Sequence, residues 1–151
     1  MTDPHAWLAF LHILGATVWV GAWVAICVFA VDAVRHPEPA VLRRLFGVMR
    51  TLGPTVIGPA TLLVLGAGIA LVARSTRTAW SDRWIVVGLA LYALVTLIGV
   101  VGLSRASVRA TRALDEGDLA AAVGATRIWL RLAVAVAAVL VLATADMVFR
   151  P

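Results

Sequence analysis

Hydrophobic residues fall in four long runs along the chain, and polar residues gather between them. The runs cover about residues 6–31, 53–73, 84–104 and 130–149. Each reaches the ~20 residues that an α-helix needs to cross ~30 Å of hydrocarbon. The apolar positions are continuous rather than alternating, which argues against the strands of a membrane β-barrel. The pattern predicts an all-α membrane protein: a bundle of four transmembrane helices that forms one domain over residues 1–151.

The composition agrees with a lipid environment. Hydrophobic residues make up 62% of the 151 residues and charged residues 14%, against roughly 45–50% and about 25% in soluble domains. A soluble fold of this length has too little interior to hide so much apolar surface. Cys27 is the only cysteine, so neither an intrachain disulfide nor a thiol metal cluster is expected.

The basic residues predict how the chain is oriented. All 13 are arginines, which is typical of a GC-rich bacterial genome, and they lie between apolar runs rather than in a nucleic-acid-binding stripe. The nine after the first and third runs are Arg35, Arg43, Arg44, Arg50, Arg105, Arg109, Arg112, Arg127 and Arg131; the other four are Arg74, Arg77, Arg83 and Arg150. The positive-inside rule places the nine in the cytoplasm. We therefore predict a multi-pass protein of the bacterial inner membrane with both termini outside.

The segments between the runs carry further signals. Residues 40–52 mix apolar residues with arginines, which predicts an amphipathic segment lying on the inner surface of the membrane. Asp118 follows an acidic turn and is expected to cap the next short helix. Four tryptophans, Trp7, Trp80, Trp84 and Trp129, fall at predicted span boundaries, where indoles anchor helix ends.

Three polar side chains inside the runs are candidates for chemistry. His12 is expected ~9 Å from the outer end of its span, Asp146 ~6 Å and Tyr92 ~12 Å, at ~1.5 Å per residue. Polar groups at such depth usually face the bundle or a cavity. The depth match suggests that His12, Tyr92 and Asp146 converge inside the bundle. The alternatives are a histidine that hydrogen-bonds for packing and an Asp146 that reaches the headgroups.

Two prolines interrupt the second run. Pro54 lies in its first turn, where proline is tolerated, but Pro59 lies further in and should kink the helix or free a carbonyl. Such a break lines the binding site of some transporters, and in other proteins it is a kink that serves packing.

Several stretches resemble a known family. The residues Leu11-His12-Ile13-Leu14-Gly15-Ala16 followed by Val18-Trp19-Val20-Gly21, then Leu52-Gly53-Pro54 and Ile57-Gly58-Pro59-Ala60, and finally Asp146-Met147-Val148-Phe149-Arg150-Pro151 are similar to the bacterial family called domain of unknown function 2269. The resemblance covers nearly the whole chain. It implies a small four-helix bacterial membrane protein and brings no established activity.

More distantly, the first run resembles copper-resistance protein D and the J-type protoporphyrinogen oxidase, in which a membrane histidine is linked to copper or haem. This chain departs from both patterns. It has no second intramembrane histidine and no lysine. A bis-histidine haem would need His12 from two copies in a dimer, or an unusual second ligand.

Three classes of function remain open. The first, which we favour, is a scaffold or partner subunit in the membrane, possible as a homodimer or beside another membrane protein. The second is a haem- or copper-binding protein that relies on His12. The third is a small transporter or channel that acts as an oligomer. A soluble-type enzyme is not expected, because the sequence has no nucleotide loop, nucleophile–base pair or zinc motif.

Overall fold

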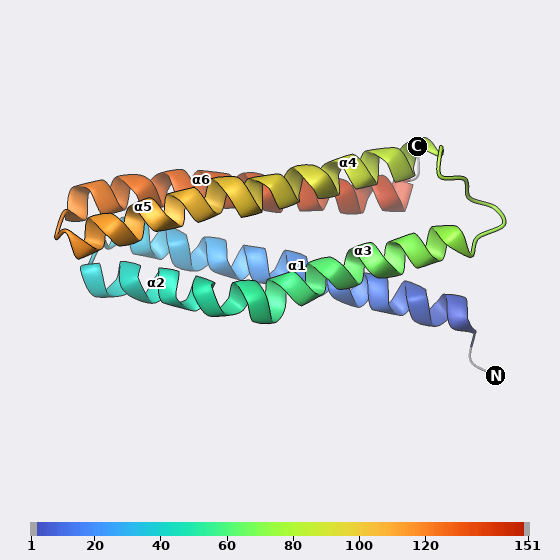
Figure 1. Ribbon diagram of the computed structural model, residues 1–151, viewed down its shortest axis with the longest axis horizontal. Coiled ribbons are helices and arrows are strands. Elements are labelled where there is room, and N and C mark those ends of the chain that lie inside the picture. The colour runs from blue at the N-terminus through green and yellow to red at the C-terminus, as the bar shows by residue number, and fades with distance from the viewer. Residues whose placement is uncertain (1–2, 150–151) are drawn as a thin grey trace.

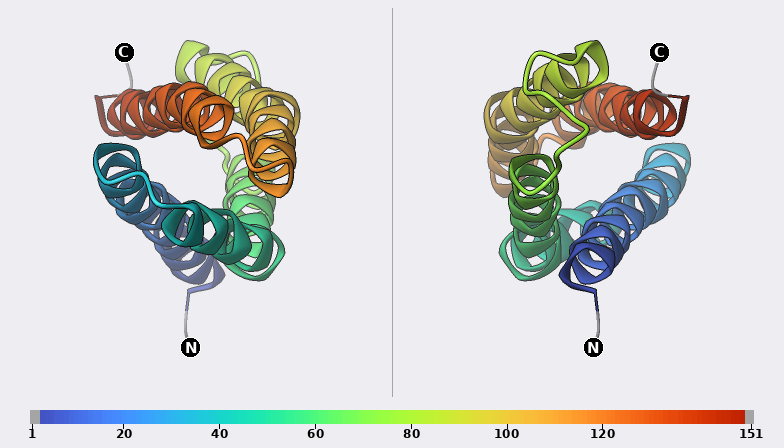
Figure 2. Two further views of the ribbon diagram at one scale, coloured as in Figure 1. Left: turned by 90° about the vertical axis from the view of Figure 1, so that its left-hand side faces the viewer. Right: turned by 90° about the vertical axis from the view of Figure 1, so that its right-hand side faces the viewer.

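The structure is a computed structural model that describes residues 3–149, so predictions that involve Arg150 lie outside the described part. Its elements are α1 (Pro4–Arg35), α2 (Pro39–Leu52), the π-helical turn η1 (Gly53–Ile57), α3 (Gly58–Ala73), α4 (Arg83–Leu97), the π-helical turn η2 (Ile98–Leu103), α5 (Ser104–Asp115) and α6 (Leu119–Phe149). They form four long rods, because α2 continues into α3 and α4 into α5 (Figure 1). Viewed from either end, the rods surround a common centre (Figure 2).

Each rod is long and apolar enough to cross a membrane. The four stretches are Pro4–Arg35, Pro39–Ala73, Arg83–Asp115 and Leu119–Phe149, of 32, 35, 33 and 31 residues. The predicted all-α bundle with four membrane-spanning helices is therefore confirmed. At ~1.5 Å per residue the rods are longer than ~30 Å of hydrocarbon. They extend beyond the predicted spans, so part of the bundle projects from the bilayer.

The helical geometry changes at the two prolines of the second rod: Pro54 lies in a π-helical turn, and Pro59 lies in the first turn of α3. Pro54 has no N–H to give to the helix, and the N–H of Gly58 bonds five residues back to the carbonyl of Gly53. The hydroxyl of Thr55 donates to the carbonyl of Thr51 at 2.7 Å. Thr61 binds the carbonyl of Ile57 in the same way, also at 2.7 Å. The backbone therefore stays helical through this region.

The segment predicted to lie on the membrane surface belongs to the bundle instead. Residues 40–52 form most of α2, which runs along the bundle beside α1 and α5 (Figure 1). Its apolar face buries Leu42, Leu45 and Phe46. The amphipathic pattern is real, but protein covers the apolar face where we expected lipid headgroups.

The best-packed part of the core lies at the end of the bundle that holds α2 and α5. Trp129 on α6 is 1% exposed. Its ring lies 6.4 Å from that of Trp23 and 6.1 Å from that of Phe46, centroid to centroid. The prediction that Trp129 anchors a helix end at the membrane interface is therefore wrong, since the indole fills the space between three helices. Trp7 and Trp80 are exposed, as interfacial anchors are.

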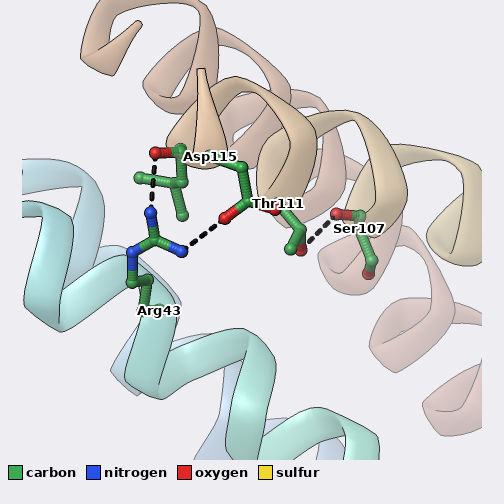
Figure 3. Close-up of polar contacts among 5 residues, drawn as sticks. Arg43, Ser107, Thr111 and Asp115 are labelled. Atoms are coloured by element: carbon green, nitrogen blue, oxygen red, sulfur yellow. Dashed lines mark hydrogen bonds and ion pairs between the residues drawn. The ribbon is translucent and has the colours of Figure 1, made fainter. Parts of the chain in front are cut away.

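The turn between α5 and α6 closes this end of the bundle. Gly117 has a φ of 77°, a left-handed conformation that suits glycine at a helix end. Asp118 accepts the N–H of Ala121 at 2.9 Å, so the predicted cap is present, although it starts the long α6 and not a short helix. Arg43 on α2 reaches across to α5. It forms an ion pair with Asp115 at 2.6 Å and donates to the carbonyl of Leu114 at 2.7 Å (Figure 3).

Candidate functional site: a cavity within the bundle

The other end of the bundle, where α1 begins and α6 ends, contains a partly open cavity of about 1300 Å³. All four rods contribute to its walls, together with the loop between α3 and α4. The helices around it are held by contacts of α1 with α3 and α6 and of α4 with α6, whereas α3 and α4 do not pack closely against each other. The cavity exists because these two neighbouring helices stay apart.

The walls of the cavity are largely apolar and its mouth is polar. Buried side chains such as Val64 and Ile85 line the interior. His5, Arg77 and Trp80 line the part nearest the α3–α4 loop. An apolar pocket with a few polar groups is the usual form of a small-molecule site.

His12 lies in the wall of this cavity, held between α3 and α6. Its Nδ1 is 2.9 Å from the carbonyl oxygen of Val64. Its Nε2 is 3.4 Å from the sulfur of Met147. The ring fits because residue 68 is glycine: a Cβ there would stand 3.2 Å from Cε1 and 3.3 Å from Nδ1 of His12.

The partners of His12 determine where its proton lies. A backbone carbonyl only accepts, so Nδ1 carries a hydrogen and donates it to Val64. A thioether has no hydrogen to give. The lone pair of Nε2 therefore faces the sulfur of Met147, which has no hydrogen to donate to it.

Tyr92 lines the same cavity from α4. Its hydroxyl donates to the carbonyl of Thr61 on α3 at 3.4 Å, a long hydrogen bond across the open side of the bundle. Its ring packs edge-on against Trp19 on α1, with centroids 5.7 Å apart. The predicted intramembrane tyrosine thus connects three helices at the inner limit of the cavity.

Asp146 lies on α6 beside the candidate site. Its Oδ2 is buried without a hydrogen-bond partner. A Cβ added to Gly88 on α4 would stand 3.8 Å from this oxygen. It would stand 3.5 Å from Cε of Met147. An unpartnered buried carboxyl oxygen is costly, so this position favours a cation or a donor from a bound molecule.

The structure brings two of the three predicted polar residues to one cavity. His12 and Tyr92 both line it, and Asp146 neighbours the lining residues Ala145 and Met147. No direct hydrogen bond between any two of the three is found, and their convergence in one functional cluster stays a prediction. Pro54 and Pro59 are not among the cavity-lining residues, so the altered helical geometry lies outside this site.

Sequence analysis missed the part that Met147 plays. A lone methionine in an apolar run carries no signal of its own, because thioethers usually serve packing. The one feature that could have indicated Met147 is its position next to Asp146, which places it at a depth in the membrane similar to that of His12. Within residues 3–149, no three His, Cys, Asp or Glu side chains gather in a way that would hold a metal ion.

Comparison with models of known protein families shows the family to which the chain belongs. A family described as "Predicted integral membrane protein (DUF2269)" matches residues 6–151. The chain belongs to this family. It is accordingly an integral membrane protein, and the cavity is a feature of this member of the DUF2269 family. No curated protein and no solved structure matches the chain. The more distant resemblances to copper-resistance protein D and the J-type oxidase stay predictions.

Proposed function

We propose that this DUF2269 protein is a membrane subunit that binds one amphipathic lipid-like molecule in its cavity. The observation that carries the proposal is the partly open cavity of about 1300 Å³ lined by all four rods. Ligand pockets usually measure roughly 300–1,000 Å³, so this space accommodates a sizeable apolar molecule. A bundle that serves only as a scaffold gains from close packing and has no need of such a space.

The distribution of polar groups supports a ligand with one charged end. The apolar interior suits an acyl or isoprenoid chain, and Arg77 near the mouth suits an anionic headgroup. Ser75 and Thr78 in the same loop add hydroxyls to this rim. Because α3 and α4 do not pack closely, we infer that a lipid enters between them from the bilayer.

This proposal refines the favoured prediction of a scaffold or partner subunit. We still propose that the protein acts together with a second copy of itself or with another membrane protein. A transporter pathway is less supported. The buried cluster of Trp23, Phe46 and Trp129 lies in the half of the bundle away from the cavity, where a pathway would need space. A haem on Nε2 of His12 would first require Met147 to move, since the sulfur is 3.4 Å away.

We further propose the bacterial inner membrane as the location, with both termini outside. Arg43, Arg105 and Arg127 belong to α2, α5 and the first part of α6. The end of the bundle that holds α2 and α5 lies opposite the α3–α4 loop (Figure 1), and that loop helps to line the cavity. The positive-inside rule assigns that end to the cytoplasm. The cavity then lies in the outer leaflet.

Native mass spectrometry of the detergent-purified protein tests the proposal, with lysophosphatidylglycerol and lysophosphatidylcholine as the probes. We expect one retained lysophosphatidylglycerol per chain and weaker retention of the zwitterionic lipid. Ala9→Phe fills part of the cavity wall and should weaken retention at least about tenfold, the loss that ~1.4 kcal/mol represents.

The control variant is Ala25→Phe, which makes the same change on an exposed part of α1 that does not line the cavity. It should bind as the unaltered protein does. Equal retention by both variants, or many weak adducts without a first tight one, would contradict the proposal.

A further inference from the structure

We propose that His12 and Met147 bind a monovalent copper ion, Cu(I), at the wall of the cavity. The inference goes beyond lipid binding and does not depend on it, because it rests on two side chains and not on the shape of the cavity. The two ligands come from α1 and α6, the first and last helices of the chain.

The spacing of the two ligand atoms suits one shared metal ion. Nε2 of His12 and Sδ of Met147 are 3.4 Å apart. First-row metals bind imidazole nitrogen at about 2.0 Å and sulfur at about 2.3 Å. An ion at those distances from both atoms would subtend an angle of roughly 105°, near the tetrahedral value, without movement of either side chain. The same spacing is too short for ligands on opposite sides of an ion, which would be about 4.3 Å apart.

The orientation of the imidazole prepares it for metal binding. The Nδ1–H group donates to the carbonyl of Val64 at 2.9 Å, which fixes the tautomer and leaves the lone pair on Nε2. Metal-bound histidines characteristically use their second nitrogen in this way. The absence of a side chain at Gly68 allows α3 to hold the ring from one side. The ligand is therefore oriented before any ion arrives.

The ligand types select the oxidation state and the metal. Thioether sulfur is a soft ligand that favours Cu(I), and imidazole also suits copper. Hard ions such as Mg²⁺ and Ca²⁺ require oxygen ligands, which this pair does not offer. The buried Oδ2 of Asp146, next to Met147 in the chain, has no hydrogen-bond partner and lies on the same side of Gly88 as the methyl group of Met147.

Competition with a Cu(I)-specific chromogenic chelator, bicinchoninic acid, tests the site under anaerobic reducing conditions in detergent. We expect the full-length protein to withdraw one equivalent of Cu(I) from the chelator. Met147→Leu should weaken Cu(I) binding at least about tenfold, in line with the 10–100-fold losses seen when metal sites are disturbed. His12→Asn should do the same. X-ray absorption at the copper edge should show one sulfur at about 2.3 Å.

Matched controls separate this site from other residues of the same type. Met49→Leu removes a methionine from α2, and His5→Gln removes a histidine from the mouth of the cavity. Both should keep one equivalent of Cu(I). Met147→Leu nearly conserves volume, so the bundle should stay folded; circular dichroism and size-exclusion chromatography verify this.

Two results would overturn the copper site. One is the absence of Cu(I) withdrawal by the folded protein. The other is withdrawal that Met147→Leu leaves unchanged. Cu(I) withdrawal and lysophosphatidylglycerol retention are measured in separate experiments on the unaltered protein, so failure of copper binding and failure of lipid binding are distinguishable.

Discussion

At the scale of single residues, sequence analysis located His12 but not its surroundings. A histidine within an apolar run is conspicuous, because polar groups inside a membrane are costly. The ring nitrogens of His12 contact Val64 and Met147, which are 52 and 135 positions away in the chain. Such contacts depend on how helices rotate against one another, and a hydrophobic pattern that is apolar on every face does not specify rotation.

Gly68 provides a test of how His12 is held. Gly68→Ala would place a Cβ 3.2 Å from the histidine ring, so the ring must shift and its bond to Val64 must weaken. We expect the free energy of unfolding to fall by about 1–3 kcal/mol, the usual cost of overpacking. Denaturant titration in detergent, followed by circular dichroism, measures the change.

The matched control is Gly66→Ala on the same helix, where an added Cβ meets nothing within 4 Å. It should change the free energy of unfolding by no more than about 0.5 kcal/mol. Similar losses in both variants would mean that the effect arises from the helix itself and not from His12.

At the scale of elements, the number and type of helices followed directly from the sequence, and their ends did not. The apolar runs marked the parts that need lipid, but α5 and the start of α6 carry arginines and extend the rods beyond those runs. From sequence alone, α2 cannot be told from a helix that lies on the membrane surface. A surface helix and a helix packed in a bundle both place their apolar residues on one side. Tertiary packing decided between them.

The contact between α1 and α3 predicts a second substitution effect. Gly15→Ala would place a Cβ 3.0 Å from Cγ2 of Val64 and 3.3 Å from the carbonyl oxygen of Ala60. The backbone oxygen cannot move aside without displacing α3. We expect a loss of about 1–3 kcal/mol in the free energy of unfolding, measured by denaturant titration.

Gly21→Ala serves as the comparison on α1, since nothing lies within 4 Å of an added Cβ there. Its free energy of unfolding should stay close to that of the unaltered protein. If Gly15→Ala were equally harmless, α1 and α3 would not be in the close contact that shapes the cavity wall.

At the scale of the whole molecule, the bundle is asymmetric along its length. One end is packed around Trp129 and surrounded by arginines, and the other contains the cavity. Sequence analysis predicted the asymmetry of charge from loop composition. It did not predict the cavity, which arises because α3 and α4 stay apart although only residues 74–82 connect them.

The proposed orientation makes a direct prediction in cells. Single cysteines are introduced at Ser81, in the α3–α4 loop, and at Glu116, between α5 and α6, in a Cys27→Ala background. A membrane-impermeant maleimide applied outside the inner membrane should label residue 81 and reach residue 116 only after lysis. The reverse pattern would show that the arginine-rich end faces outward.

Photolabelling with a palmitic acid that carries a diazirine on its chain tests the central claim most directly, because it reports where the ligand lies. If the ligand occupies the cavity, labels should concentrate on buried lining residues such as Val64 and Ile85. These labels should disappear in Ala9→Phe and in the presence of excess lysophosphatidylglycerol. Labels spread over the lipid-exposed surface, with Val28 and Phe29 as strongly marked as Val64, would contradict a ligand-binding cavity.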